Sequence, residues 1–482
     1  MIITPTSLRR ALAALFVLAA ALIGAREAHA KPPSIILVMA NDVGYGDFSC
    51  LGNPIVQTPN FDRFYRQSVR FTNFHVSPTS SATRAALLTG RHEFRSGVTQ
   101  TMLERERMRL DATTIAQVLR SAGYATGIFG QWHLGDEAAY QPEKRGFDET
   151  FIHGGGGLGE TQPGSAGDAP GNTHFDPMVL HNGEFVETLG FSTDVFFQHA
   201  IEWMDEQLDA GKPYFACIMP TAAQPPICPP EYQRRYARKV PPNVAAYFGM
   251  IANLDDNFGH LLDKLQEWGS EETTLVIFLS DHGGSTGVEI FNAGMRGGQA
   301  TPYEGGTRVP LFWRWSGQWK AGADVSALTA HLDLFPTLAH IAGAEIPAAV
   351  AAKLEGRDLL PLLKDSAAPW PDRLLYTHIA GWKMGEAARS KYASSSVRDS
   401  RFSLVNNAEL YDLQADPGQM KNILREHADE AEKLRSAYDQ WWEEIQPDLV
   451  NENAVGPKLN AFKERYWKQF GGGPAKESSD SK

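Results

Sequence analysis

Ser34-Ile-Ile-Leu-Val-Met-Ala-Asn-Asp-Val-Gly-Tyr-Gly-Asp47 is the stretch of sequence that decides the fold. Its first seven residues form a continuous apolar run, as expected of a central parallel strand buried on both faces. The run ends in a polar, glycine-rich loop, and α/β sheets place their chemistry in the loops that follow the carboxyl ends of their strands. The stretch therefore predicts an α/β fold with a functional site near Asn41 and Asp42.

The same pattern recurs three times further along the chain. Apolar strands are predicted at 124–129, 214–219 and 274–279, and each follows a predicted helix, at 113–122, 193–208 and 244–268. Each strand ends in a loop that contains polar residues together with glycine or proline. We therefore predict a large, mixed, mostly parallel sheet sandwiched by helices, with the site along the edge formed by the carboxyl ends of the strands.

The pattern changes in the last quarter of the chain. Short alternating strands are predicted near 374–378, 395–398 and 402–405, followed by a charged amphipathic helix over 428–445. This pattern indicates a small antiparallel sheet with a packed helix. The expected division is an α/β domain over 31–368, an α+β subdomain over 369–450 and an extension over 451–482 that is disordered from Gly471. The glycine-rich segment 154–171 is predicted to be an exposed loop near a cleft.

The first thirty residues have the features of a cleavable secretory signal. A basic pair, Arg9-Arg10, precedes an apolar segment that is too short to span a bilayer, and Ala28-His-Ala30 supplies a cleavage site after Ala30. No later apolar run approaches 18 residues, so the mature protein is expected to be periplasmic or secreted, by either general or twin-arginine export.

The formal net charge of −12 argues against nucleic acid or an anionic membrane as a partner. The three cysteines allow at most one disulfide.

A second informative stretch runs from Ser77 to His92. A hydroxyl-rich turn leads into Ala-Ala-Leu-Leu and then Thr89-Gly90, which predicts a helix that starts near Ser80 and ends at Gly90. The free N–H groups of a first helical turn attract anions, and Arg84 adds a cation one turn further on. An N-capped surface helix would have the same pattern.

The strand ends carry other groups that could act together. Asp42 and Asp281 each follow a buried strand and could share a hard cation such as Ca²⁺. His133 and His282 occupy similar positions. A single aspartate after a strand is most often a helix cap, but several polar groups at one sheet edge favour a site.

Taken together, these segments resemble the sulfatases of the alkaline phosphatase superfamily. The resemblance covers about 34–422, and it rests on several motifs: Asn41-Asp-Val-Gly-Tyr-Gly-Asp47, Thr89-Gly-Arg91, Gly130-Gln-Trp-His-Leu-Gly135, Asn253-Leu-Asp-Asp256, Ser280-Asp-His-Gly283, Tyr303-Glu-Gly-Gly-Thr-Arg-Val-Pro310, His331-Leu-Asp-Leu-Phe-Pro-Thr337 and Glu409-Leu-Tyr-Asp-Leu-Gln-Ala-Asp-Pro-Gly418. It implies an alkaline phosphatase-like fold and a sulfated small molecule or glycan as the substrate.

The resemblance also implies roles for individual residues. A Cys or Ser in the family signature is oxidised to formylglycine, and Ser80-Ser-Ala-Thr-Arg84 is that signature here, with Ala82 in place of the usual proline. Ser80 is thereby the candidate precursor of formylglycine. Asn41, Asp42, Asp281 and His282 stand at the positions that bind Ca²⁺ in the family: Asp42 and Asp281 match the family pattern, and His282 stands where Asn is commoner, although His occurs there too. Arg84 and His133 match catalytic positions.

Four positions depart from the family pattern. Asn41 replaces a metal-binding aspartate, Gln131 and Gln299 replace two lysines, and Gln224 replaces a histidine. Each change substitutes a neutral amide for a charged or titratable group, and an amide can neither hold a positive charge nor deliver a proton near neutral pH. Removal of one preorganised donor typically costs about 10²–10³ in kcat.

Three functions therefore stay open at this point. The first is a degenerate sulfatase that binds a sulfated ligand with weak or no turnover. The second is an active sulfatase that hydrolyses sulfate esters through formylglycine at Ser80. The third is a phosphatase or phosphodiesterase that uses unmodified Ser80 with two metal ions. The sequence does not determine the oligomeric state.

Overall fold

A ten-stranded mixed sheet forms the centre of the fold. We describe the protein from a computed structural model, which covers residues 31–159, 166–221 and 226–474. The strand order is β11-β2-β10-β9-β1-β8-β4-β5-β6-β7. In that order the bounds are Asp324–Val325, Val69–Phe71, Leu311–Trp315, Thr274–Ser280, Ser34–Ala40, Tyr214–Met219, Ala125–Gln131, Glu149–His153, Met178–His181 and Glu184–Glu187.

The five strands β9, β1, β8, β4 and β5 are parallel to one another, and antiparallel strands extend the sheet on both sides. The predicted strand segments therefore form the middle of the sheet, which confirms a large, mostly parallel sheet. The antiparallel strand β10 and the β6–β7 pair were not predicted. A separate short parallel pair joins β3 (Phe74–His75) to β12 (Thr329–Ala330).

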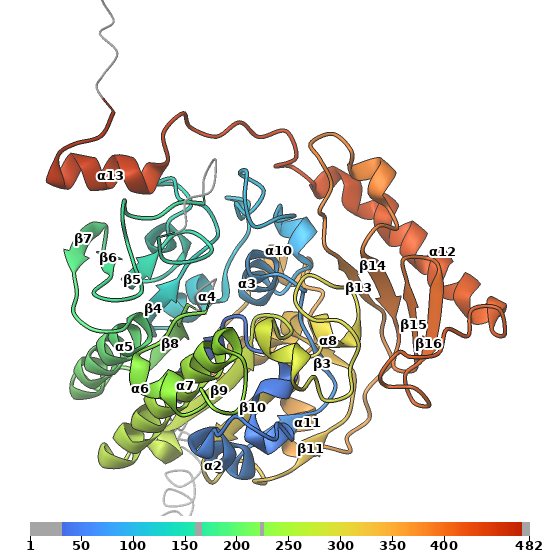
Figure 1. Cartoon of the computed structure of the whole chain (residues 1–482), viewed down its shortest axis with the longest axis horizontal. Coiled ribbons are helices and arrows are strands. Elements are labelled where there is room, and N and C mark those ends of the chain that lie inside the picture. The colour runs from blue at the N-terminus through green and yellow to red at the C-terminus, as the bar shows by residue number, and fades with distance from the viewer. Residues whose placement is uncertain (1–30, 160–165, 222–225, 475–482) are drawn as a thin grey trace, which may run out of the picture. The chain divides into compact units, whose positions relative to one another are not determined.

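Helices cover both faces of the sheet (Figure 1). Alternate residues of β1 enter two different cores: Ile36 and Val38 belong to one, and Ile35 and Leu37 to the other. This alternation follows from the two-residue period of a strand. On the first face lie α2 (Pro59–Gln67), α5 (Ser192–Asp209), α6 (Pro230–Arg234) and α7 (Pro242–Glu267). On the second face lie α3 (Ser80–Thr89), α4 (Ile115–Ser121), α9 (Leu334–Ile341), α10 (Ala348–Ala351) and α11 (Leu360–Lys364).

A four-stranded antiparallel sheet follows in the chain, as predicted. Its strands are β13 (Leu375–His378), β14 (Ser395–Arg398), β15 (Phe402–Val405) and β16 (Glu409–Asp412). Helix α12 (Ala428–Ile445) packs on β14 and β15 through a core that contains Trp441, Trp442 and Leu404. The short helix α8 (Glu304–Thr307) precedes β10, and α13 (Ala461–Phe470) contacts β7.

The described residues from Pro33 onward form one compact unit. The predicted signal peptide and the residues after 474 lie outside the described chain, so these two predictions are not tested. Within the described residues, none of the helices is long and apolar enough to cross a membrane. The three cysteines are all free, and Cys217 is buried in β8.

One prediction about the glycine-rich segment was wrong. Of its described residues, 154–158 and 166–169 are mostly buried rather than exposed, whereas Gly159 and Gly171 are exposed. The carboxylate of Asp136 accepts a hydrogen bond from the backbone N–H of Gly167 at 2.6 Å, and Gly155 donates to the carbonyl of Gly167 at 2.8 Å. Glycine permits this close backbone packing because a Cβ at Gly154 would lie 2.6 Å from the carbonyl oxygen of Gly167.

Candidate functional site

The parallel pairing of β1 with β9 brings the first two site segments together. Ala40 is in register with Ser280, and the N–H of Asp281 donates to the carbonyl of Ala40 at 2.9 Å. The chain then turns at Asp42, which has a φ of 59°. Aspartate tolerates this left-handed conformation better than most residues. Asn41, Asp42 and Asp281 consequently lie side by side, as the sequence pattern predicted.

Asn41 connects the strand ends to helix α3. Its side-chain N–H donates to the Asp281 carboxylate at 2.5 Å and to the Ser80 hydroxyl at 3.2 Å. Ser80 is the first residue of α3 and is partly exposed, whereas Asn41 and Asp281 are buried. The helix begins and ends close to the predicted positions, with Gly90 in the left-handed conformation at its carboxyl end. Ser80 is thus more accessible than the buried Asn41 and Asp281 beside it.

His282 and Gln299 surround the carboxylate of Asp42. The Nε2 atom of His282 lies 3.1 Å from Asp42 Oδ1 and 3.6 Å from Asp281 Oδ1, and Gln299 Nε2 donates to Asp42 Oδ1 at 2.7 Å. Burial favours the neutral imidazole, but the charges of Asp281 and Asp42 outweigh it and raise the pKa of His282 to about 9. Both carboxylates therefore already have protein partners.

Arg84 is directed into the sheet edge and is buried. One of its terminal nitrogens donates to the backbone carbonyl of Gln131 at 2.8 Å, and the other donates to the side-chain oxygen of Gln131 at 2.5 Å. The guanidinium also lies 3.8 Å from Asp281. Burial lowers the pKa of Arg84 to about 10, although Asp281 and Asp42 oppose this effect, so the side chain stays charged at neutral pH.

Gln131 uses both ends of its amide within the protein. Its Nε2 atom donates to the carbonyls of Gly156 at 2.6 Å and Gly155 at 3.2 Å, and it lies 3.2 Å from His133 Nδ1. The side chain is fully buried. Gln131 therefore links Arg84 to the loop after β5 and leaves no donor for a ligand.

His133 is held in one tautomer by its neighbours. Its Nε2 atom lies 2.8 Å from the carbonyl of Thr101, so Nε2 carries the proton, and Nδ1 is unprotonated and faces Gln131 Nε2 at 3.2 Å. Burial lowers the pKa of His133 to about 4, and Arg84 adds to this effect. The imidazole is neutral near pH 7.

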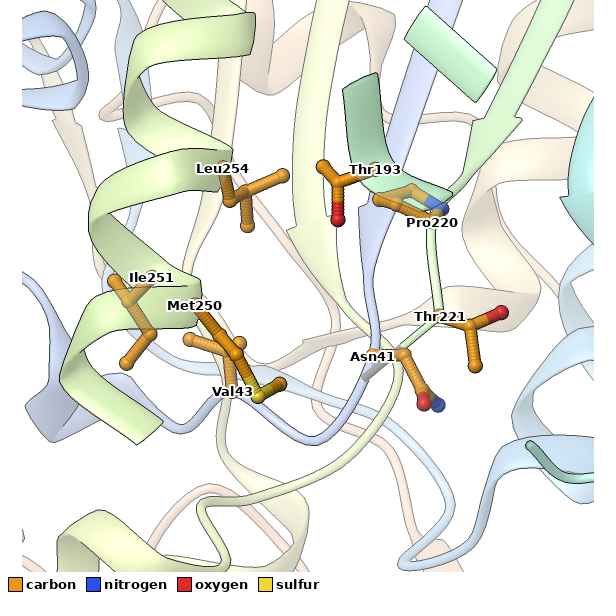
Figure 2. Close-up of a pocket in the computed structure, with 8 residues that line it drawn as sticks. All are labelled: Asn41, Val43, Thr193, Pro220, Thr221, Met250, Ile251 and Leu254. Atoms are coloured by element: carbon orange, nitrogen blue, oxygen red, sulfur yellow. The ribbon is translucent and has the colours of Figure 1, made fainter. Parts of the chain in front are cut away.

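A pocket opens beside Asn41 (Figure 2). The side chains of Met250, Ile251 and Leu254 from α7 line one side of it. Thr193, Pro220, Thr221 and Val43 complete the lining, so the eight residues of this pocket are all uncharged. The lining of this pocket, as given by the described residues, is therefore mostly apolar.

The structure brings together most of the residues that the sequence singled out. Nine of them contact one another directly or through one shared neighbour: Asn41, Asp42, Ser80, Arg84, Gln131, His133, Asp281, His282 and Gln299. Gln224 lies outside the described residues. Sequence reasoning missed the carbonyls of Thr101, Gly155 and Gly156. Backbone acceptors of this kind have no signature in a sequence.

The chain matches known proteins over most of its length. A family model for sulfatases matches residues 33–344, and a model for the C-terminal part of N-sulphoglucosamine sulphohydrolase matches 300–446. Human arylsulfatase A is 31% identical over 82% of this chain and 84% of its own length. N-acetylgalactosamine-6-sulfatase of Canis lupus familiaris is 30% identical over 72% of this chain and 69% of its own length.

Solved structures share the fold. Ps i-CgsB, solved in complex with k-i-k-neocarrahexaose, has a TM-score of 0.78 at 24% identity, over 91% of this chain and 97% of that one. The phosphonate monoester hydrolase of Agrobacterium radiobacter has a TM-score of 0.59 at 20% identity, over 86% of this chain and 96% of that one. The fold is thus that of the alkaline phosphatase-like α/β proteins. Within that class, the chain belongs to the sulfatase family.

Proposed function

We propose that this protein is a degenerate sulfatase, which binds a sulfated carbohydrate or aryl sulfate with weak or no turnover. The observation that carries this proposal is the position of Gln131 and Gln299. Both stand where the family resemblance implies lysine, and both amides are engaged with the protein itself. Similarity to relatives such as N-acetylgalactosamine-6-sulfatase favours a sulfated carbohydrate as the ligand class.

The presence of Gln131 in place of a lysine removes a positive charge and also changes the partners of the side chain. A lysine would supply a cation that stabilises the charge on the transferring sulfuryl group. The Gln131 amide instead accepts from Arg84 and donates to two glycine carbonyls. Arg84 and His282 are the cations that remain, but the terminal nitrogens of Arg84 contact Gln131 and Met219, and His282 faces the carboxylates of Asp42 and Asp281. The positive charge available to an anionic transition state is therefore reduced.

Gln299 affects the metal-binding residues as well. Its amide donates to Asp42, which the family resemblance assigns to Ca²⁺. Asn41 contributes no charge, so two carboxylates remain among the four candidate ligands Asn41, Asp42, Asp281 and His282. The donor set suits a hard divalent cation because the carboxylates and the Asn41 amide supply oxygen atoms. The lower ligand charge should weaken its affinity for Ca²⁺.

When bound, Ca²⁺ would polarise an oxygen of a sulfate ester. The protein's own groups would do the rest of the binding. Ser80 is partly exposed in the first turn of α3, and a helix amino terminus attracts anions. His133 is neutral and donates its Nε2 proton to Thr101, which makes it a poor proton donor to a leaving group. Binding is thus retained better than catalysis.

The other predictions from the sequence complete the proposal. We propose export to the periplasm or the medium after cleavage behind Ala30. We also propose an α/β domain over 31–368, a C-terminal subdomain over 369–450 and an extension beyond it. N-terminal sequencing of the mature protein tests the cleavage site.

Two measurements test the function. Purified protein should hydrolyse 4-nitrocatechol sulfate slowly or not at all. Peptide mass spectrometry of the Ser80 segment, from the native host, should show unmodified serine. The expected pair of results is therefore an unmodified Ser80 and no hydrolysis that depends on it.

The same measurements distinguish the two alternative functions. Robust hydrolysis that is abolished in Ser80→Ala, together with formylglycine at position 80, would establish an active sulfatase and sink the proposal. Hydrolysis of a phosphate ester, together with two zinc ions per chain, would instead establish a phosphatase. The fold similarity to a phosphonate monoester hydrolase makes that assay worthwhile.

A further inference from the structure

Three potential metal ligands meet at the edge of the sheet opposite to Ser80. Glu149 is the first residue of β5, His181 is the last residue of β6, and His199 lies on α5. The candidate sulfatase site, by contrast, lies at the carboxyl end of β5, where His153 is in register with Gln131. Glu149, at the amino end of the same strand, belongs to a different region of the protein.

The strand pairing places these side chains on one face. Glu149 and Phe151 are two residues apart on β5, so they project to the same side. His181 is in antiparallel register with Phe151 and therefore projects to that side as well. Helix α5 packs on the same face, since its Phe196 lies edge-on to Phe151 at 5.9 Å. His199 of α5 consequently approaches Glu149 and His181 from the helix that covers this face of the sheet.

The three ligand atoms converge on a small space. The Nε2 atom of His181 lies 2.7 Å from Glu149 Oε1, and the Nε2 atom of His199 lies 3.1 Å from the same oxygen. All three atoms lie within 4.8 Å of one another. In the described part of the chain, this is the one group of three such residues that meets that distance.

Neighbouring groups hold the ligands in these orientations. The ring of His199 stacks on Phe151 with centroids 3.9 Å apart and an interplanar angle of 20°. The second oxygen of Glu149 accepts from Asn182 Nδ2 at 3.0 Å, and Asn182 accepts in turn from the backbone N–H of Thr150. Burial alone would raise the pKa of Glu149, but its hydrogen bonds to His199, Asn182 and His181 lower it to about 2. Such supporting contacts around ligands are typical of metal sites.

We propose that Glu149, His181 and His199 bind a divalent transition-metal ion of the Zn²⁺ type and that this ion joins β5, β6 and α5. Two imidazole nitrogens and one carboxylate oxygen suit Zn²⁺, whereas Ca²⁺ and Mg²⁺ prefer oxygen ligands alone. The side chains of His181, Glu149 and His199 are 32%, 15% and 26% exposed, so an ion can enter and water can fill a fourth position.

Binding requires only small movements of the side chains. Zn–N distances of about 2.0–2.1 Å place tetrahedral ligand atoms about 3.3 Å apart, so the 2.7 Å contact opens by roughly half an ångström. On binding, each neutral imidazole carries its proton on Nδ1 instead of Nε2, and the freed Nε2 lone pair binds the ion. The ion thus replaces the contacts that the two Nε2 atoms now make with Glu149 Oε1.

Zinc titration of the chelator-treated full chain tests the proposal. Isothermal titration calorimetry with ZnCl₂ should give one tight site in the wild type, and the midpoint of thermal unfolding should rise with zinc concentration. The site should be lost in His181→Gln and His199→Gln. It should persist in His260→Gln, which removes an exposed histidine of α7, and in Asp281→Asn, which alters the candidate calcium site.

The experiment must distinguish a metal site from a His–Glu–His group that is held together by hydrogen bonds alone. Unchanged zinc binding in the His181 and His199 variants, or its loss only in Asp281→Asn, would overturn the proposal. Absence of tight binding in the wild type would overturn it too. If a variant does not fold, the wild type still decides: Co²⁺ should give the intense visible bands of a four-coordinate site with nitrogen and oxygen ligands, and weak octahedral bands would contradict it.

Discussion

Gln131 has a structural role that does not depend on any role in catalysis. It accepts a hydrogen bond from Arg84 and donates to the carbonyls of Gly155 and Gly156, all within the buried edge of the sheet. Such a fully satisfied amide stabilises the fold, and its partners would lose their bonds if it changed. A substitution at Gln131 therefore tests whether the site still binds an anion.

Gln131→Lys should destabilise the protein and make it dependent on an anion. The new ammonium would lie beside the Arg84 guanidinium, and an uncompensated buried charge costs about 3–5 kcal/mol. A sulfate ion in the site would pair with both cations and offset part of this loss. Thermal unfolding in sodium sulfate and in sodium chloride, at equal ionic strength, measures the effect.

The general stabilisation by sulfate has to be subtracted from this measurement. Wild-type protein and Gln318→Lys, which adds a lysine at an exposed position, supply the two references. If sulfate raises the unfolding midpoint of Gln131→Lys no more than it raises those of the references, an anion does not bind next to this position.

His378 should make the protein less stable in weak acid. Its Nδ1 atom accepts from the N–H of Ala380 at 2.9 Å, and its Nε2 atom lies 2.9 Å from the carbonyl of Ser390, so protonation would set two N–H groups against each other. Burial lowers its pKa to about 4. The unfolded chain has a histidine pKa of about 6.5, so it binds one more proton than the folded chain between about pH 6.5 and 4.

Stability is therefore lost as the pH falls through that window, by at most about 1.4 kcal/mol per pH unit for this one residue. His378→Gln keeps a donor and an acceptor but does not titrate. Urea unfolding between pH 7 and pH 4.5 should show a smaller slope of stability against pH in the variant. Equal slopes in the two proteins would show that His378 does not contribute.

At the scale of single elements, helix α3 depends on the way it ends. Gly90 has a φ of 64°, and its N–H donates to Ala86 at 2.8 Å. A Cβ there would lie 2.8 Å from the side chains of both Leu354 and Phe335. Glycine is therefore required twice, once for the backbone conformation and once for the packing of α3 against α9.

Gly90→Ala should lower the free energy of unfolding by more than Gly123→Ala. Gly123 has a φ of 91°, but a Cβ there would meet no atom within 4 Å, so its variant measures the conformational cost alone. That cost is about 1–2 kcal/mol, and overpacking adds about 1–3 kcal/mol at Gly90. Denaturant unfolding of the two variants gives the comparison. Equal losses would mean that Leu354 and Phe335 move aside at no cost.

The elements also show which parts of the fold the sequence could predict. The runs at 34–40, 214–219 and 274–280 were readable because a strand buried on both faces has to be apolar throughout. Strand β10, at 311–315, contains Trp, Arg and Trp, and its antiparallel pairing with β9 and β2 depends on contacts far away in the chain. Tertiary pairing of this kind leaves no period in the sequence.

The candidate site also has features that the sequence could predict and features that it could not. Asp42 and Asp281 could be placed at strand ends, because parallel strands bring their carboxyl ends to one edge. The replacement of charged groups by Gln131 and Gln299 was visible in the sequence, but their partners were not. The cluster of Glu149, His181 and His199 was not predicted, because its members are separated by 32 and 50 residues and come from three elements.

At the scale of the whole molecule, a buried ion pair joins the small antiparallel sheet to helix α8, which precedes β10 of the large sheet. Arg398 of β14 donates to the Glu304 carboxylate of α8 at 2.5 Å and to His75 of β3 at 2.7 Å. The side chains of Arg398 and Glu304 are each 7% exposed. Loss of one partner would leave the other charge buried and unpaired, which is the costly case for such pairs.

Arg398→Met should therefore reduce the free energy of unfolding by about 3–5 kcal/mol, because the Glu304 carboxylate then has no cation beside it. The double variant Arg398→Met/Glu304→Gln should be more stable than Arg398→Met alone, since no buried charge is left over. Arg63→Met, which breaks an ion pair between exposed side chains, should change stability little. Urea unfolding of the wild type, the single variants Arg398→Met and Glu304→Gln, and the double variant measures the coupling, with Arg63→Met as the control. If the double variant loses the sum of the two single losses, the two charges act independently and the ion pair does not fix the small sheet to the rest of the protein.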